Sequence, residues 1–185
     1  MMEKNRTKWN ERYQQEPHPK PPSPIVRRFC ARAPRGRALD IACGTGGNTG
    51  FVAAKGFAVD AVDISDAALG ILSQQTPAVN AVQADLDTYE IPPDRYTLIL
   101  NIRFLNRRLF PYIKEALLPG GMLIFETFVE APRGHTLTVS CRDYLLRENE
   151  LLHAFLSLYV IHYEEKSVVT PRGKGKMASL VGIKR

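Results

Sequence analysis

The feature that most constrains the fold is an apolar run that breaks into glycines and resumes as a second apolar run ending in an acid. It spans Arg37 to Ser65 and reads "RALDIACGTGGNTGFVAAKGFAVDAVDIS". Two short apolar runs, Arg37–Ala42 and Phe57–Val62, each follow a glycine and are separated by a helix-length segment, about 47–55. This pattern predicts a βαβ unit, in which a ligand binds outside the carboxyl ends of parallel strands.

The later apolar runs extend this unit into a larger sheet. Further strands are expected at 78–84, 96–101, 122–128, 157–164 and 177–183, and helices at 65–75, 107–117 and 147–154. Strands that alternate with helices favour an α/β, doubly wound fold with a mostly parallel sheet. A chain of 185 residues that is 44% hydrophobic suits one such domain.

The first 24 residues differ from the rest in composition. Trp9 and Tyr13 share one face of a helix expected over Thr7–Gln15, and the stretch "EPHPKPPSP" predicts a proline-stiffened connector. Ser23 is expected to cap a further helix that runs to about Arg32. We therefore expect an N-terminal helix and connector over 1–24 and the α/β domain over 25–185.

Charge and cysteine content limit the classes of protein and partner. A formal net charge of +6 permits a nucleic-acid partner but is explained better by solvated basic faces. Three widely spaced cysteines and no pair of histidines at ligand spacing predict neither a disulfide framework nor a metal site. Without an apolar stretch of membrane-spanning length we expect a cytoplasmic protein that has no membrane partner. The oligomeric state stays open.

Three acids follow three successive strands of the expected sheet. Asp40 lies beside the glycine turn, Asp63 ends the second strand 19 positions after Gly44, and Asp85 ends the third. A nicotinamide fingerprint would need glycine where Thr49 stands, and Asp40 would repel a pyrophosphate. The three carboxylates instead suit an ammonium group, a ribose and an exocyclic amine, all of which S-adenosylmethionine carries.

The segments "ALDIACGTGGNT", "VDAVDIS", "VQADL" and "LLPGGMLIFET" resemble the successive motifs of class I S-adenosylmethionine-dependent methyltransferases. The opening "WNERYQQEPHPKPPSP" is similar to the N-terminal segment of small bacterial methyltransferases of the tellurite-resistance type. The resemblance implies a seven-stranded sheet (a Rossmann-like methyltransferase fold) that ends in an antiparallel hairpin, with S-adenosylmethionine as cofactor.

The resemblance also implies a set of cofactor contacts. Asp40 and the turn Gly44–Gly46 would hold the methionine part, Asp63 the ribose, and Asp85 with Leu86 the adenine. Further candidates for cofactor contact are Trp9, Tyr13, Ala42, Asn48, Ile64 and Asn101. Many members have glycine where this chain has Ala42, so the first turn is expected to be less open. The helix that bears Trp9 and Tyr13 is either a lid over the cofactor or an anchor to the domain surface.

The methyl acceptor is expected at the end of the fourth strand and in the loop after the fifth. Members that methylate bases often have Asn/Asp-Pro-Pro-aromatic where this chain has "NIRF", which favours a small-molecule acceptor. The candidate substrate residues are Arg103, Phe104 and His135; of these, Arg103 could hold an anion and His135 could act as a base. Methyl transfer needs a base only if the acceptor arrives protonated, so no residue is named as catalytic.

Two other functions fit the same motifs. One is an RNA or protein methyltransferase, and the other is a noncatalytic module that binds S-adenosylmethionine or S-adenosylhomocysteine. Steep salt dependence of nucleic-acid binding would favour the first, whereas cofactor binding without any methyl transfer would favour the second.

Overall fold

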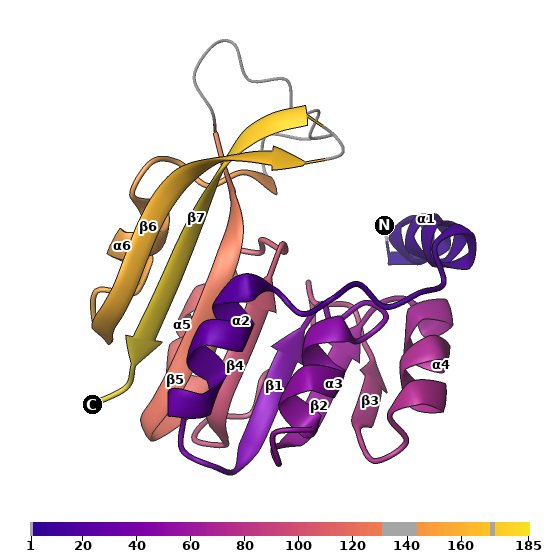
Figure 1. Ribbon diagram of the computed structural model, residues 1–185, viewed down its shortest axis with the longest axis horizontal. Helices are drawn as coiled ribbons and strands as arrows, with labels where there is room; N and C mark the ends of the chain where they lie inside the picture. Colours follow the sequence, from indigo (N-terminus) through magenta and orange to yellow (C-terminus); the bar gives the residue numbers. More distant parts are fainter. Residues whose placement is uncertain (1, 131–143, 171–172) are drawn as a thin grey trace.

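The computed structural model describes residues 2–130, 144–170 and 173–185. They form a seven-stranded sheet with the order β3-β2-β1-β4-β5-β7-β6. The strands are β1 (Arg37–Ile41), β2 (Ala58–Asp63), β3 (Asn80–Gln83), β4 (Tyr96–Ile102), β5 (Leu117–Val129), β6 (Tyr159–Thr170) and β7 (Gly173–Ile183). β7 runs antiparallel to both β5 and β6, whereas the other pairs are parallel. The doubly wound sheet with a final antiparallel hairpin is therefore confirmed (Figure 1).

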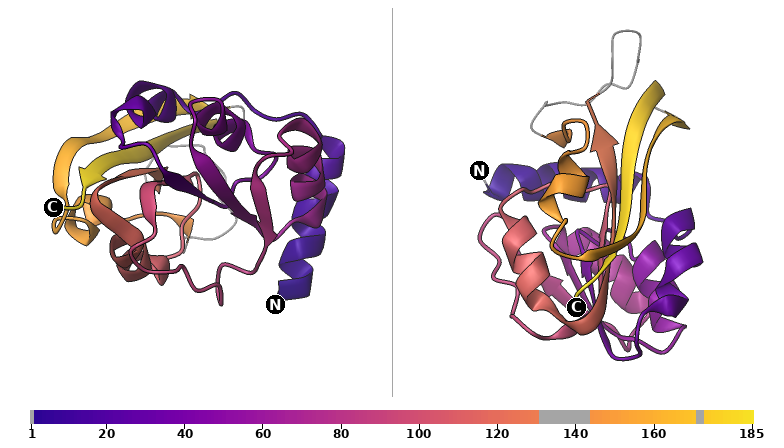
Figure 2. Two further views of the ribbon diagram at one scale, coloured as in Figure 1. Left: turned by 90° about the horizontal axis from the view of Figure 1, so that it is seen from below. Right: turned by 90° about the vertical axis from the view of Figure 1, so that its left-hand side faces the viewer.

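Helices cover both faces of the sheet (Figure 2). They are α1 (Met2–Gln15), α2 (Pro24–Phe29) with the 3-10 turn η1 (Cys30–Arg32), α3 (Gly47–Ala53), α4 (Asp66–Gln75), α5 (Leu109–Ala116) and α6 (Glu150–Ala154). Alternate residues of β4 face opposite sides: Leu98 and Leu100 pack with α2 and α3, while Ile99 packs with α5 and α6. Both faces are buried, which explains why β4 reads as a continuous apolar run.

The hairpin is longer than the sequence pattern predicted. Strands were expected over 157–164 and 177–183, but β6 continues to Thr170 and β7 begins at Gly173. β5 pairs with β7 only as far as Val129 opposite Lys176. Among the described residues, the outer parts of β6 and β7 therefore pair only with each other.

The bounds of other elements also differ from expectation. α5 and α6 are shorter than the expected helices, and α1 begins five residues earlier, at Met2 rather than Thr7. β5 begins at Leu117, before the "LPGG" segment, because Leu117 pairs with Tyr96 ahead of a register shift. Ser23 does precede α2, but its side chain makes no capping hydrogen bond.

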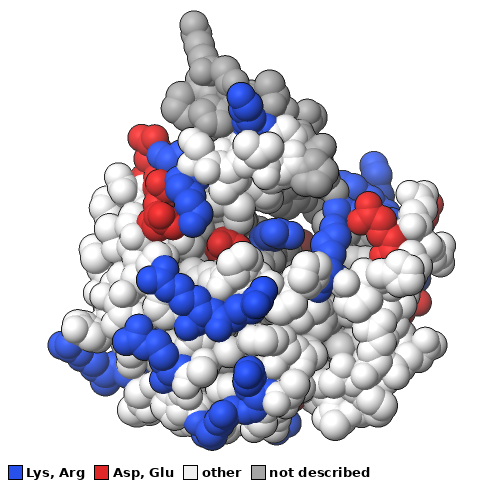
Figure 3. Space-filling view, viewed as in Figure 1, with Lys and Arg blue, Asp and Glu red and all other residues white. Residues whose placement is uncertain are grey.

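The carboxyl ends of the parallel strands lie on one side of the molecule, together with α1 and the connector (Figure 1). The space-filling view is hollowed on this side, beneath the outer end of the hairpin (Figure 3). No helix within the described ranges is long and apolar enough to cross a membrane.

Candidate active site

The glycine turn after β1 is built from left-handed backbone. Ala42, Gly44 and Gly46 have φ values of 54°, 55° and 84°. Glycine adopts this conformation at little cost, whereas alanine is strained in it. The turn is fixed by hydrogen bonds from the Cys43 N–H to the Val62 carbonyl and from the Gly46 N–H to the Cys43 carbonyl. It leads directly into α3, so its backbone N–H groups lie at the strand end where a ligand is expected.

Asp63 joins this turn to the end of β2. One of its oxygens accepts a hydrogen bond from the Gly44 N–H at 2.8 Å, and the other accepts one from the Ser65 N–H at 2.9 Å. The residue is only 5% exposed, and burial raises the pKa of its carboxyl above the ordinary value. Its carboxylate is therefore held in one orientation, with lone pairs left to accept hydroxyl groups.

Asp40 is more deeply buried than Asp63. It is 1% exposed, and its Oδ2 accepts a hydrogen bond of 2.6 Å from the Thr49 hydroxyl. Burial raises the pKa of this carboxyl to about 7, although the bond from Thr49 opposes that effect. A nearby cation would favour the charged form, but it could contact Asp40 only if the covering segments moved aside.

Asp85 lies in a tight turn two residues after β3. Its Oδ1 accepts a hydrogen bond of 3.0 Å from the Asp87 N–H, and its carbonyl accepts bonds from Thr88 and Tyr89. The following residue, Leu86, buries its side chain in the main core. The strand-end positions of Asp40, Asp63 and Asp85 thus agree with the sequence pattern.

Helix α1 lies across this end of the sheet and packs beside α4. Asn10 holds it there: its Nδ2 donates to Asp66 at 2.8 Å, and its Oδ1 accepts from the Ser65 hydroxyl at 2.6 Å. The rings of Trp9 and Tyr13 stack with centroids 5.9 Å apart. Burial, and next the charge of Asp63, raise the pKa of Tyr13, which places this side chain near Asp63 at the glycine turn.

The connector is held over the start of α3. A Cβ atom on Gly47 would overlap the Lys20 carbonyl, so only glycine fits there. Asn48, which was expected to contact the cofactor, accepts a hydrogen bond of 2.8 Å from the Ser23 N–H. The Ser23 hydroxyl donates to Glu126 of β5 at 2.8 Å, which is why it does not cap α2. These bonds fix the connector across the strand ends.

The end of β4 forms a strained turn. Arg103 has a φ of 59° and an exposed side chain, and its N–H donates to the Glu126 carbonyl at 2.6 Å. The buried Asn101 closes the turn by donating to the Phe104 carbonyl at 2.7 Å. Because αL strain in a residue other than glycine persists only where its surroundings enforce it, this turn is a candidate functional element. His135 lies outside the described residues.

The hydrogen-bonding groups at this edge of the sheet fit S-adenosylmethionine. Three carboxylates lie at or just after the carboxyl ends of three adjacent parallel strands, and the glycine turn brings backbone N–H groups to the same edge. No cluster of His, Cys, Asp and Glu in the described part of the chain could hold a metal ion.

Comparison with known proteins agrees with this geometry. Residues 38–121, which include the glycine turn and the three acids, match the family model described as "Methyltransferase domain". The chain carries a class I S-adenosylmethionine-dependent methyltransferase domain. S-adenosylmethionine is the cofactor of this methyltransferase domain. A comparison with curated proteins finds no match.

Solved structures share the fold of the methyltransferase domain at low sequence identity. TehB from Haemophilus influenzae is 19% identical, with a TM-score of 0.75 over 87% of this chain and 61% of TehB. A methyltransferase from Methanosarcina mazei is 16% identical, with a TM-score of 0.69 over 89% of this chain and 99% of that one. A phosphoethanolamine N-methyltransferase from Haemonchus contortus is 17% identical, with a TM-score of 0.66 over 86% of this chain and 51% of that one. The chain thus spans about three fifths of the length of TehB.

Several residues of the site carried no signal in the sequence. Asn10, Ser23 and Glu126 connect α1 and the connector to the methyltransferase domain through long-range hydrogen bonds. Asn106 and Arg108 bind the turn that contains Asp85. A single asparagine or arginine outside a motif cannot be told from an ordinary surface residue, so only the structure identifies them.

Proposed function

We propose that the protein transfers the methyl group of S-adenosylmethionine to a small, anionic acceptor at the carboxyl end of β4. The observation that carries this proposal is the turn at Arg103. An exposed guanidinium sits on a strained backbone that Asn101 and Glu126 hold in place. A guanidinium carried by this turn suits a carboxylate or phosphate, to which it can donate two parallel hydrogen bonds.

The cofactor would be held by the three acids. Asp63 accepts hydrogen bonds from the ribose hydroxyls, Asp85 accepts from the adenine amine, and Asp40 attracts the ammonium group. When bound, S-adenosylmethionine supplies a methyl group that is already activated by its sulfonium. The chain therefore has to orient the acceptor about 3 to 3.5 Å behind that methyl and to exclude water.

We assign the exclusion of water to α1. Its Tyr13 lies over the glycine turn, and its Asn10 binds the segment that follows Asp63. An aromatic face suits a sulfonium or an adenine, because both make favourable contacts with a ring. The buried position of Asp40 also requires a cover that opens, and in this proposal α1 opens when the bonds of Asn10 break.

One solved structure with the same fold supports a small, anionic acceptor. The Haemonchus contortus enzyme was solved with phosphomonomethylethanolamine, an acceptor that carries a phosphate.

Incubation with methyl-labelled cofactor and a metabolite extract tests the proposal directly. We expect an anionic metabolite to gain the label. For that metabolite, Arg103→Gln should raise KM much more than Arg103→Lys, while leaving the affinity for S-adenosylhomocysteine unchanged. Efficient labelling of ribosomal RNA and of no metabolite would overturn the assignment. Cofactor binding without transfer to any compound would favour the noncatalytic module.

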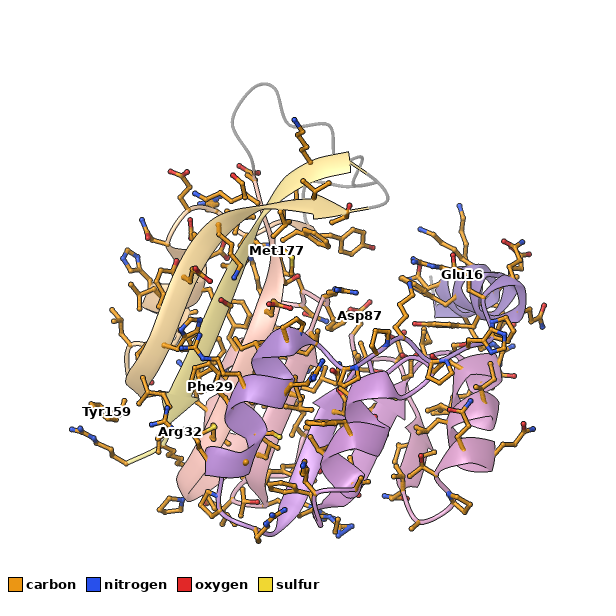
Figure 4. All side chains as sticks on the ribbon, in the orientation of Figure 1. Glu16, Phe29, Arg32, Asp87, Tyr159 and Met177 are labelled. Atoms are coloured by element: carbon orange, nitrogen blue, oxygen red, sulfur yellow. The ribbon has the colours of Figure 1, made fainter. Side chains whose placement is uncertain are left out.

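A second candidate function, methylation of RNA, is favoured by the distribution of charge. Residues 17–59 contain seven Lys or Arg residues and one acid, the buried Asp40, so this segment accounts for the whole net charge of +6. Five of its exposed cations form what we call the basic face, made of Arg27, Arg28, Arg32, Arg35 and Lys55; the sixth, Lys20, pairs with Glu16 instead. The charged residues over α2 in Figure 3 are blue, and Figure 4 labels Phe29 and Arg32 there.

The basic face is free to bind anions. Within the described residues, none of its five cations forms an ion pair with an Asp or Glu. The guanidinium groups of Arg28 and Arg32 lie 4.9 and 5.8 Å from the centroid of the Phe29 ring. The exposed large apolar side chains of the described residues all lie outside 24–55, the segment that carries these cations. This surface therefore suits a phosphate backbone better than an apolar partner.

Two variants that each lose three positive charges can separate the effect of the basic face on RNA binding from the effect of net charge. Removal of three cations by Arg28→Gln, Arg32→Gln and Arg35→Gln should lower the slope of log affinity against log salt for single-stranded RNA by about 2. The control removes three exposed cations elsewhere, through Lys4→Gln, Lys8→Gln and Arg147→Gln. Equal loss in both variants, or no RNA binding by the parent protein, would remove this candidate function.

A further inference from the structure

The turn that contains Asp85 is not held by the sheet alone. It follows β3, a four-residue strand at the edge of the sheet whose residues are exposed or half-buried. Within the turn, the N–H groups of Thr88 and Tyr89 donate to the Asp85 carbonyl, and the Asp87 N–H donates to the Asp85 carboxylate. The direction of that carboxylate therefore depends on the shape of residues 85–89, which we call the adenine turn.

Two side chains from the segment after β4 bind the adenine turn from outside. Asn106 donates from Nδ2 to the Leu86 carbonyl at 3.2 Å and to the Asp87 carboxylate at 2.9 Å. Arg108 donates from Nη2 to the same Leu86 carbonyl at 3.0 Å and to the Tyr89 carbonyl at 2.7 Å. Figure 4 labels Asp87 at the same end of the sheet as the connector.

The two donors also hold each other in place. The Arg108 N–H donates to the Asn106 Oδ1 at 3.1 Å, which fixes the carboxamide so that its Nδ2 faces the turn. The Arg108 guanidinium lies 5.3 Å from the centroid of the Tyr112 ring. Its Nε is buried and has no partner among the described residues, an arrangement that costs free energy. The bonds to the two turn carbonyls are the interactions that offset this cost.

The same segment is fixed at its other end by the strained turn of the acceptor site. There Asn101 binds the Phe104 carbonyl, and Arg103 binds the Glu126 carbonyl. Residues 101–108 thus form one rigid link between the proposed acceptor site and the adenine turn.

We propose that Asn106 and Arg108 are positioning residues, which hold the adenine turn so that the Asp85 carboxylate is oriented toward the adenine amine of the cofactor. Neither residue contacts the cofactor itself. The inference rests on the proposed function, specifically on the adenine role of Asp85. It adds two residues that set the affinity for the adenine part of the cofactor. Neither residue lies in a methyltransferase motif of the sequence.

Calorimetry with S-adenosylhomocysteine tests this inference without any need for turnover. Loss of the Asn106 bonds in Asn106→Ala should weaken binding by about 3- to 10-fold. The matched control is Asn80→Ala, which removes a carboxamide bonded at 2.8 Å to Asp60 at the opposite end of β3. The control should bind as the parent protein does. If Asn106→Ala fails to fold, Asn106→Ser makes the same comparison.

A double-mutant cycle separates positioning from general support of the structure. If Asn106 acts through Asp85, then adding Asn106→Ala to Asp85→Ala should weaken binding little further. Arg108→Lys, which keeps the charge but cannot bridge both carbonyls in the same geometry, should also weaken binding. Parent-like affinity of Asn106→Ala, or additive losses in the cycle, would overturn the inference and leave the proposed function intact. Failure of the parent protein to bind S-adenosylhomocysteine would overturn both.

Discussion

The hydroxyl oxygen of Tyr13 lies 2.7 Å from the position that a Cβ atom on Gly44 would occupy. A helix from the N-terminal segment is thus fitted against the glycine turn closely enough that no side chain can stand there. The size of the residue at 44 and the position of α1 are therefore linked.

This fit makes Gly44→Ala doubly costly. Alanine at a φ of +55° is strained by about 1 to 2 kcal/mol, and its methyl group would also have to displace Tyr13. We expect urea denaturation to show a larger loss in the free energy of unfolding than for Gly56→Ala. Gly56 also has a positive φ, of +88°, but a Cβ atom there would meet only a nitrogen of the flexible Arg35 side chain, at 3.6 Å. Equal losses in the two variants would mean that Tyr13 moves aside without cost.

The attachment of α1 offers a test of the lid. Asn10→Ala removes the bonds to Ser65 and Asp66, so α1 should detach more often and the connector should be cleaved faster by protease. If α1 is a lid, the same variant should bind S-adenosylhomocysteine several-fold more weakly, and added ligand should slow cleavage of the parent protein. The exposed Glu11 provides the control, since Glu11→Ala should change neither property. Faster cleavage with unchanged affinity would support the anchor role instead.

The sequence predicted the parts of the site that local patterns encode. Asp40, Asp63 and Asp85 follow apolar runs that end in glycine or loop residues, and the ends of parallel strands meet at one edge of the sheet. Their placement therefore needed only the order of the elements. The turn around Ala42 was predicted to be less open, which stays a prediction; the structure adds that this alanine has a positive φ of 54°.

The parts that were missed depend on contacts between distant segments. Ser23 was expected to cap α2, but Glu126, far along the chain, takes its hydroxyl instead. The bond between the connector and Asn48 was likewise not predicted. The outer hairpin was also missed: among the described residues, the outer ends of β6 and β7 pair only with each other, and the apolar alternation that marks a strand is weak there.

Ala42 is predicted to be a site where glycine increases stability. Alanine in the left-handed region destabilises the folded state by about 1 to 2 kcal/mol. Glycine avoids this strain, but folding then costs about 0.5 to 1 kcal/mol more, because glycine has more conformational freedom in the unfolded chain. Ala42→Gly should therefore raise the free energy of unfolding by roughly 0.5 to 1 kcal/mol in urea denaturation. The control, Ala67→Gly in α4, should lower it by a similar amount, because a helix disfavours glycine. A destabilised Ala42→Gly would show that the methyl group makes packing contacts that outweigh the backbone strain.

Binding of the cofactor should depend on pH through Asp40. Burial raises the pKa of its carboxyl to about 7, so the group is largely protonated at pH 6 and largely charged at pH 8. A bound ammonium group favours the charged form and lowers that pKa, so binding below pH 7 must release a proton. The affinity for S-adenosylhomocysteine should therefore rise as the pH increases from 6 to 8, by at most about tenfold per pH unit, and then level off. Calorimetry in two buffers of different ionisation enthalpy measures the proton directly. Asp40→Asn should bind more weakly, with an affinity that does not change between pH 6 and pH 8. If the parent protein bound S-adenosylhomocysteine equally well at pH 6 and pH 8, Asp40 would not contact the ammonium group.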